Sequence, residues 1–167
     1  MDTYQFPKHP DTELTASRQQ DAEYYRQRFI TYPPCAYGRF TFKKEPADLD
    51  AAVGAVRKCC NRISGERRRI WFWVAAERGG VNDRRHCHVF LFGDPKLTLK
   101  DYPIIRSHWL QGRIIGLSPF QKGGGAEWYM GWKMALGRER AWEMSKKLAR
   151  RIGKLESAED SPGPSPA

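Results

Sequence analysis

Two strongly apolar runs separated by a short polar segment constrain this sequence more than any other feature. The first run, IWFWVAA, covers residues 70–76, and the second, HCHVFLFG, covers residues 86–93. Both runs have the length of a strand, and aromatic and β-branched residues favour strands. The segment between them, ERGGVNDRR, is rich in Gly, Asn and Asp, which are typical of turns. We therefore expect the two runs to pair as an antiparallel hairpin.

Weaker patterns on either side of this hairpin predict an α+β fold. Alternating residues in YGRFTFKK predict a strand at 37–44, and RIIGL predicts another at 113–117. Apolar residues at helical spacing predict helices at about 15–29, at 48–63, from Ala126 onward, and over a last pattern that contains Ala141, Ser145, Leu148 and Ile152. We expect a central antiparallel sheet of about five strands, as in RRM and ferredoxin-like domains, with flanking helices.

The length of 167 residues suits one folded domain with tails. We divide it into an N-terminal arm and helix (1–36), a core (37–137), a basic C-terminal helix (138–154) and a Pro- and Ser-rich tail (155–167). The tail composition predicts disorder.

The charge balance favours a polyanionic partner. There are 29 Lys and Arg residues against 19 Asp and Glu residues, a formal net charge of +10. Nucleic acid is the commonest partner of such a basic chain, whereas solubility alone is the simpler interpretation. The polar N-terminus lacks a signal-peptide pattern, and no apolar run is long enough to span a bilayer. The four cysteines form no C-x-x-C pair, so we expect reduced thiols, a cytoplasmic location and no membrane partner.

The hairpin also carries a candidate metal site. His86 and His88 lie two apart on a strand and therefore project from one face, whereas Cys87 projects from the other. If the turn is centred near residues 81–82, Glu77 pairs with His86 and shares that face. Two imidazoles and one carboxylate suit Mn²⁺ or Mg²⁺, with Zn²⁺ as a further possibility.

A helical tyrosine is the candidate nucleophile. In EWYMGWK, Tyr129 and Lys133 lie one turn apart, so they are neighbours on one helix face. We expect Trp128 and Trp132 to pack on the sheet, with Tyr129 and Lys133 facing outward. A free phenol has a pKa of about 10, and a nearby ammonium favours the phenolate.

These motifs, in this order, resemble those of HUH endonucleases, in particular the rolling-circle replication initiators of small plasmids and single-stranded DNA phages. The matches are RFTFKK (39–44), HCH (86–88) with the upstream acid Glu77, and Tyr129 followed by Lys133. The segment WLQGRII (109–115) resembles the link between the second and third motifs. The resemblance covers roughly residues 36–137.

The resemblance implies a function and a set of roles. Glu77, His86 and His88 would bind Mg²⁺ or Mn²⁺, and Tyr129 would attack a phosphodiester to leave a 5′-phosphotyrosine bond and a free 3′-OH. Lys133 would steady the phosphate or the phenolate. The substrate would be single-stranded or hairpin DNA at a replication origin. A host helicase is implied because the chain has no G-x-x-x-x-G-K-[ST] loop. The DNA backbone would contact basic residues, namely Arg39, Lys43, Lys44, Arg78, Arg84 and Arg85.

The third motif departs from the family pattern, in which lysine usually follows the tyrosine by three residues and a second tyrosine often follows by four. Here these positions are Trp132 and Lys133, which implies a single-tyrosine enzyme. A single-tyrosine HUH transposase would use the same chemistry, although the usual glutamine after the tyrosine is absent.

Two further interpretations lie outside this chemistry. The first is a non-catalytic RRM-like module that would stack bases on outward-facing aromatic residues such as Phe42, Trp71 or Trp73. The second is a zinc protein that uses residues 86–88, which the alternation of side chains along a strand disfavours.

Overall fold

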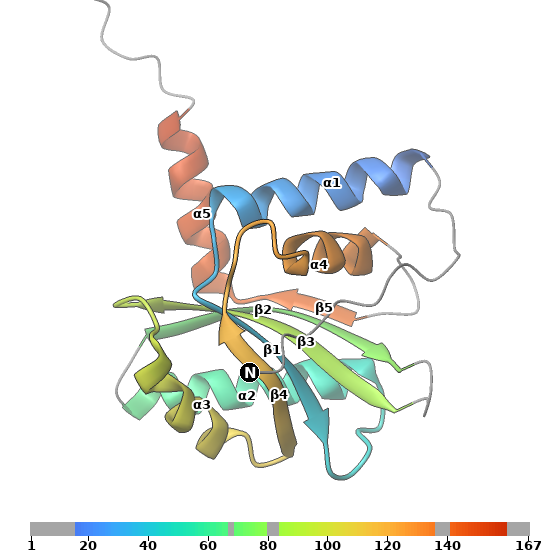
Figure 1. Cartoon of the computed structure of the whole chain (residues 1–167), viewed down its shortest axis with the longest axis vertical. Helices are drawn as coiled ribbons and strands as arrows, with labels where there is room; N and C mark the ends of the chain where they lie inside the picture. Colours follow the sequence, from blue (N-terminus) through green and yellow to red (C-terminus); the bar gives the residue numbers. More distant parts are fainter. Residues whose placement is uncertain (1–15, 67–68, 80–83, 136–140, 160–167) are drawn as a thin grey trace, which may run out of the picture.

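The computed structural model describes residues 16–66, 69–79, 84–135 and 141–159 and contains one five-stranded antiparallel sheet (Figure 1). The strands are β1 (Ala36–Phe42), β2 (Arg69–Arg78), β3 (Arg85–Asp94), β4 (Gly112–Pro119) and β5 (Ala141–Met144). The helices are α1 (Ala16–Thr31), α2 (Leu49–Glu66), α3 (Tyr102–His108, after the 3-10 turn Leu99–Asp101), α4 (Ala126–Ala135) and α5 (Lys146–Glu159). The expected α+β fold is thus confirmed.

The sheet has a ferredoxin-like core. The elements β1, α2, β2, β3, α3 and β4 follow one another in the order βαββαβ, and their strands lie in the spatial order β4-β1-β3-β2. The fifth strand, β5, pairs with the outer edge of β2. The hairpin predicted from the two apolar runs is β2 with β3, at the centre of the sheet.

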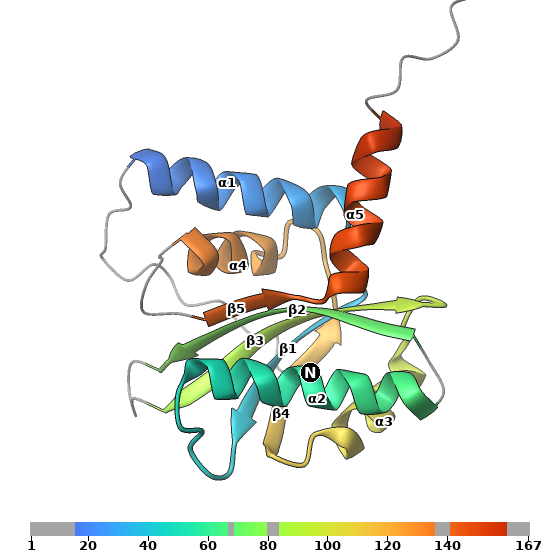
Figure 2. The ribbon, with the colours of Figure 1, turned by 180° about the vertical axis from the view of Figure 1, so that it is seen from behind.

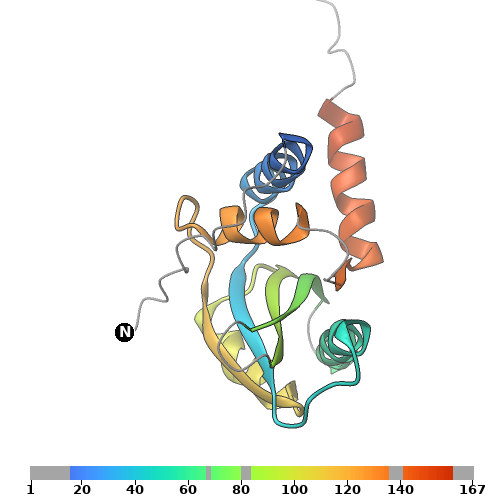
Figure 3. The same ribbon diagram turned by 90° about the vertical axis from the view of Figure 1, so that its right-hand side faces the viewer.

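Helices cover both faces of this sheet. On one, which we call the α2 face, α2 and α3 pack over Phe40, Val89 and Leu91 (Figure 2). On the other, the α4 face, α4 lies over the strands and α1 packs on top of α4 (Figure 3). The α4 face has its own aromatic core, which includes Trp73 and Phe90. Because the central strands are buried on both sides, their sequences are almost continuously apolar.

The C-terminal region differs from the sequence prediction. The expected helix over Ala141 is wrong, because Ala141–Met144 forms β5, in which Glu143 pairs with Val74 of β2. The edge of β2 offers unpaired backbone groups, and pairing with them outweighs a weak helical pattern. Helix α5 then continues to Glu159, so the disorder predicted from residue 155 is wrong for 155–159. That stretch, LESAE, is compatible with a helix, and the first proline is Pro162. Residues 160–167 lie outside the described part.

The N-terminal helix belongs to the same fold as the core. Phe29 of α1 is fully buried and contacts Trp73 and Phe90 with ring centroids 4.6 and 4.5 Å apart. The predicted arm at residues 1–14 lies outside the described segments. Among the described helices, none combines the length and apolar character needed to cross a membrane.

A glycine sets the close approach of α1 and α4. A Cβ atom added at Gly131 would lie 2.5 Å from the carbonyl oxygen of Ala22 and 3.1 Å from the amide nitrogen of Arg26. We expect Gly131→Ala to destabilise the protein by about 1–2 kcal/mol, because the clash outweighs the better helix propensity of alanine. Gly153→Ala is the matched control, since a Cβ there meets nothing within 4 Å. It should stabilise by roughly 0.5–1 kcal/mol in urea unfolding. Equal effects of the two variants would contradict this account.

Candidate functional site

The register of the hairpin brings the three predicted metal ligands to one face. Glu77 of β2 pairs directly with His86 of β3, and Ala75 pairs with His88. Directly paired residues share a face, so all three side chains project from the α4 face. Cys87 projects from the α2 face and is fully buried. The pairing predicted from the sequence is confirmed.

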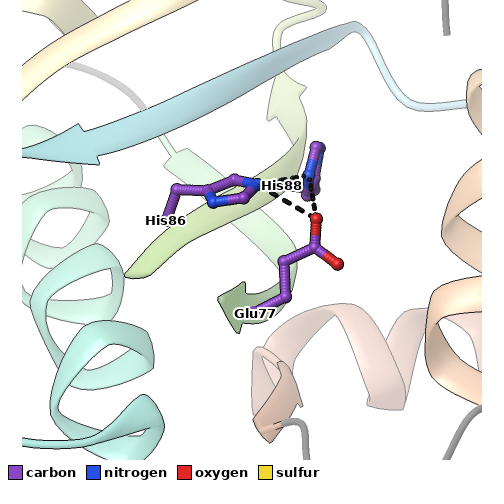
Figure 4. Close-up of side chains that lie close together, drawn as sticks. All are labelled: Glu77, His86 and His88. Carbon is purple, nitrogen blue, oxygen red and sulfur yellow. Dashed lines mark hydrogen bonds and ion pairs between the residues drawn. The ribbon is translucent and has the colours of Figure 1, made fainter. Parts of the chain in front are cut away.

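The three side chains converge (Figure 4). The Oε1 atom of Glu77 lies 3.0 Å from Nε2 of His86 and 3.0 Å from Nε2 of His88. The two Nε2 atoms are also 3.0 Å apart. The exposed side-chain fractions are 1% for His88, 6% for Glu77 and 14% for His86. The group is therefore most open to solvent on the side of His86.

This group can hold a metal ion. Its ligand atoms all lie within 4.8 Å of one another, and they combine two imidazole nitrogens with one carboxylate oxygen. Without a metal, the Nε2 atoms of His86 and His88 can share only one hydrogen bond, in which one donates and the other accepts. A cation between them would instead be bound by lone pairs of both imidazoles and of the Glu77 carboxylate. Three protein ligands leave coordination positions for water or substrate, as in catalytic metal sites.

The tyrosine of α4 reaches the same cluster. The hydroxyl of Tyr129 donates a hydrogen bond of 2.9 Å to Oε1 of Glu77 and lies 3.3 Å from Nε2 of His88. The expectation that Tyr129 faces outward is wrong, because the side chain is only 5% exposed while Trp128 is 37% exposed. Helix α4 thus turns its tyrosine, with Ala126 and Met130, toward the sheet.

Lys133 lies on α4, one turn after Tyr129. Its side chain is outside the described part of the structure, so its contact with the tyrosine stays a prediction.

A second tyrosine holds the most buried histidine. The hydroxyl of Tyr37, on β1, lies 2.5 Å from Nδ1 of His88, and the two rings are stacked. When the lone pair of Nε2 of His88 is free to bind a metal, Nδ1 carries the proton and donates a hydrogen bond to the hydroxyl oxygen of Tyr37. Such outer partners fix the orientation of a ligating ring. Sequence reasoning missed Tyr37, although its place on the β1 face that carries Arg39 was a usable signal.

The predicted DNA-binding residues fall into two groups. The first group is either exposed to solvent or lies beside the candidate metal ligands. Arg39 pairs with His88 and so lies on the α4 face beside it. Lys43 and Lys44 are exposed directly after β1, and Arg78 is exposed at the end of β2. Lys43, Lys44 and Arg78 are thus exposed cations, whereas Arg39 is only partly exposed.

The second group binds the chain itself. Arg84 donates to the carbonyl oxygens of Phe42 and Lys43 at 2.8 and 3.3 Å. Arg85 donates to Oε1 of Glu45 at 3.1 Å and to the carbonyl oxygen of Pro46 at 2.9 Å. These contacts tie the start of β3 to the connection between β1 and α2, which is a structural use of both side chains.

Sequence reasoning also missed Arg113. Thr41 pairs with His86 on one side and with Arg113 of β4 on the other. Glu77, His86, Thr41 and Arg113 therefore form one row across four strands on the α4 face. Arg113 is exposed, so it adds a cation to the open side of the candidate site.

The three aromatic residues that the sequence suggests for base stacking are buried. Phe42, Trp71 and Trp73 are 6%, 9% and 2% exposed. The α4 face, which carries the two tryptophans, is covered by helices. These three residues offer no stacking platform, which removes the main support for an RRM-like binding module.

Cys87 is a poor metal ligand. Burial and the nearby negative charge of Glu77 raise the pKa of its thiol far above the ordinary value. Burial also raises the pKa of Cys59 to about 11. Cys87 also projects from the α2 face, away from the two histidines, so the residues at 86–88 do not act as a joint zinc site.

No protein-family model, curated protein or solved structure matches this chain. The geometry of the site therefore carries the functional argument.

Removing the carboxylate should weaken metal binding strongly. We expect Mn²⁺ to stabilise the wild-type protein, by about 2.7 kcal/mol at 100 times the dissociation constant. Glu77→Gln keeps the shape of the side chain but loses its charge, and it should weaken Mn²⁺ binding by roughly 100-fold or more. Glu143→Gln on the neighbouring strand β5 is the control. Titration calorimetry and thermal unfolding measure both effects, and equal Mn²⁺ affinity in the two variants would contradict the assignment.

Tyr37→Phe should act through His88. The variant removes the partner of a buried ring nitrogen, so we expect Mn²⁺ affinity to fall by about 10-fold. The free energy of unfolding should also fall, by about 1–3 kcal/mol. Tyr24→Phe is the control, because Tyr24 is 53% exposed on α1. Unchanged Mn²⁺ affinity in Tyr37→Phe would show that the contact does not orient the ligand.

Proposed function

We propose that this protein nicks and rejoins single-stranded DNA through a 5′-phosphotyrosine intermediate, as a single-tyrosine enzyme of the HUH type that initiates rolling-circle replication. One observation carries the proposal. A single phenol hydroxyl lies within hydrogen-bonding distance of both a carboxylate and an imidazole of a group that can hold a metal ion. A buried tyrosine needs polar partners for its hydroxyl, and here both partners belong to the candidate metal ligands.

The residues around the phenol have distinct roles in the proposed reaction. Tyr129 forms a bond from its oxygen to phosphorus, and the bond from phosphorus to the 3′-oxygen breaks. Oε1 of Glu77 and Nε2 of His88 are the polar atoms nearest to the phenolic proton. The 3′-oxygen leaves as a hydroxyl with a proton equivalent to the one that the phenol loses. Attack by that hydroxyl on the phosphotyrosine returns the proton to the phenol and restores the strand. The covalent intermediate conserves the energy of the phosphodiester.

Glu77, His86 and His88 would hold Mg²⁺ or Mn²⁺, which supplies Lewis-acid polarisation of the non-bridging phosphate oxygens. The mixed nitrogen and oxygen ligands favour Mn²⁺ and tolerate Mg²⁺. His86, the most exposed of the three, marks the side on which the phosphate enters.

Cations on the open side of the site would hold the DNA backbone. Arg39 and Arg113 lie on the same sheet face as the ligands, and Lys43 and Lys44 are exposed beside them. The net charge of +10 agrees with a polyanionic substrate. The substrate would be an origin segment that is single-stranded or extruded as a hairpin. A host helicase in the cytoplasm would open the duplex for replication.

The test is formation of a covalent adduct. The protein is incubated with labelled single-stranded oligonucleotides that tile its own replicon, in Mn²⁺, and is resolved on a denaturing gel. We expect a shifted protein–DNA band that disappears with EDTA, with Tyr129→Phe and with Glu77→Gln. Tyr102→Phe, a buried tyrosine under the α2 face, is the matched control and should keep the band.

The pattern of loss separates the candidate roles. An adduct that persists in Tyr129→Phe would assign the nucleophile to another residue. Specific binding of the oligonucleotides without cleavage in Mn²⁺ or Mg²⁺ would show a binding protein and overturn the proposed reaction.

A further inference from the structure

A second basic surface lies away from the candidate site, between the start of β2 and helix α5. There the structure forms an open groove of about 830 Å³. Five cationic side chains line it over a tryptophan, and these six residues are Arg69, Trp71, Lys147, Arg150, Arg151 and Lys154. No acidic residue of the described segments is among its lining. Figure 1 shows α5 near the end of the sheet where β2 begins, opposite to the end where β3 begins.

The cations of α5 form one stripe. Arg150, Arg151 and Lys154 follow Lys147 by three, four and seven residues, so the four side chains share a face of the helix. The stripe spans about 10 Å, at roughly 1.5 Å per residue. The apolar residues Leu148 and Ile152 are buried in the aromatic core and anchor the helix. The stripe is therefore held on a rigid support.

These charges are largely uncompensated within the described part of the chain. Arg151 forms an ion pair of 3.5 Å with Asp94, and both side chains are about half exposed. The described residues provide no ion-pair partner for Arg69, Lys147, Arg150 or Lys154. Asp94, which also faces Arg69 across the β2–β3 ladder, is one carboxylate beside five cations. Grouping the remaining like charges costs free energy unless an anion binds between them.

The floor of the groove indicates which kind of anion fits. Trp71 is 9% exposed, and the guanidinium of Arg151 lies 5.1 Å above its ring. An unpaired base therefore finds no free aromatic face, and stacking is how single strands are commonly held. What the groove offers is a row of cationic side chains, which matches the regular phosphates of a duplex backbone.

We propose that this groove binds the phosphate backbone of duplex DNA. This inference rests on the proposed nicking function, because the duplex would be the stem of the hairpin substrate. Arg69 and Glu77 stand eight residues apart on β2, or about 26 Å at roughly 3.3 Å per residue. At about 3.4 Å per base pair, the bound stem would lie about eight base pairs from the nicked phosphate.

A glycine within the groove allows a precise test. Gly153 lines the groove, and a Cβ atom there meets nothing within 4 Å. Gly153→Glu, Gly153→Gln and Gly153→Lys therefore change the charge of the groove without a clash. Asn61→Glu, at an exposed position of α2, is the control for net charge. All variants carry Tyr129→Phe, and binding is measured in EDTA so that neither metal nor covalent chemistry contributes.

The readout is fluorescence anisotropy with a 16-base-pair duplex and with one of its strands alone. We expect Gly153→Glu to weaken duplex binding by roughly tenfold, Gly153→Gln to have little effect and Gly153→Lys to strengthen it. Asn61→Glu should match the parent protein. The triple variant Lys147→Ala, Arg150→Ala, Lys154→Ala should lower the slope of log affinity against log salt by roughly 0.9 for each phosphate that it no longer neutralises.

Several outcomes would overturn the proposal: no duplex binding by the parent, equal effects of Gly153→Glu and Asn61→Glu, or equal weakening for single strand and duplex. The nicking function is tested separately. The Gly153→Glu variant that keeps Tyr129 is incubated with a short single strand, and the covalent adduct is measured. If only the groove is wrongly assigned, that adduct persists. If only the nicking function is wrong, the duplex binding persists.

Discussion

The pairing of β2 with β3 is the interaction on which the rest of the structure depends. The two strands form the centre of the sheet, and their ladder runs from Arg69 opposite Asp94 to Arg78 opposite Arg85. A slip of one residue would turn every side chain of one strand to the other face. It would move His88 into the apolar core under α2 and separate it from Glu77. The register that buries the apolar residues correctly is therefore the same register that assembles the candidate metal site.

The helices that cover the α4 face complete the candidate metal site, because they bring a reactive side chain to it. A ferredoxin-like sheet carries its two helices on one face, here α2 and α3, and leaves the other face to be used. In this protein α4 and α1 close that face, which buries its tryptophans and brings the hydroxyl of Tyr129 to Glu77. Burying charged and polar groups is costly unless they are paired. Tyr37, Tyr129 and the three candidate ligands satisfy one another through a continuous set of contacts.

The positive charges of the chain serve at least two purposes. Arg84 and Arg85 bind carbonyl and carboxylate oxygens of the β1–α2 connection and thus brace the fold. Arg39 and Arg113 instead lie on the face that carries the candidate ligands. A net charge predicts a polyanionic partner, but it does not reveal which cations are already occupied within the protein.

The sequence alone determined the features that depend on local periodicity. The hairpin, the shared face of His86 and His88, and the position of Glu77 opposite His86 all follow from the alternation of side chains along strands of known length. Tertiary structure decided the rest, because it depends on contacts between distant segments. The edge of β2 made 141–144 a strand rather than a helix, and the packing of α4 against the sheet turned Tyr129 inward. It also brought Tyr37 to His88 and Arg113 into line with Glu77. A helix shows its own apolar side in its sequence, but only the surface on which it docks selects the residues that face that surface.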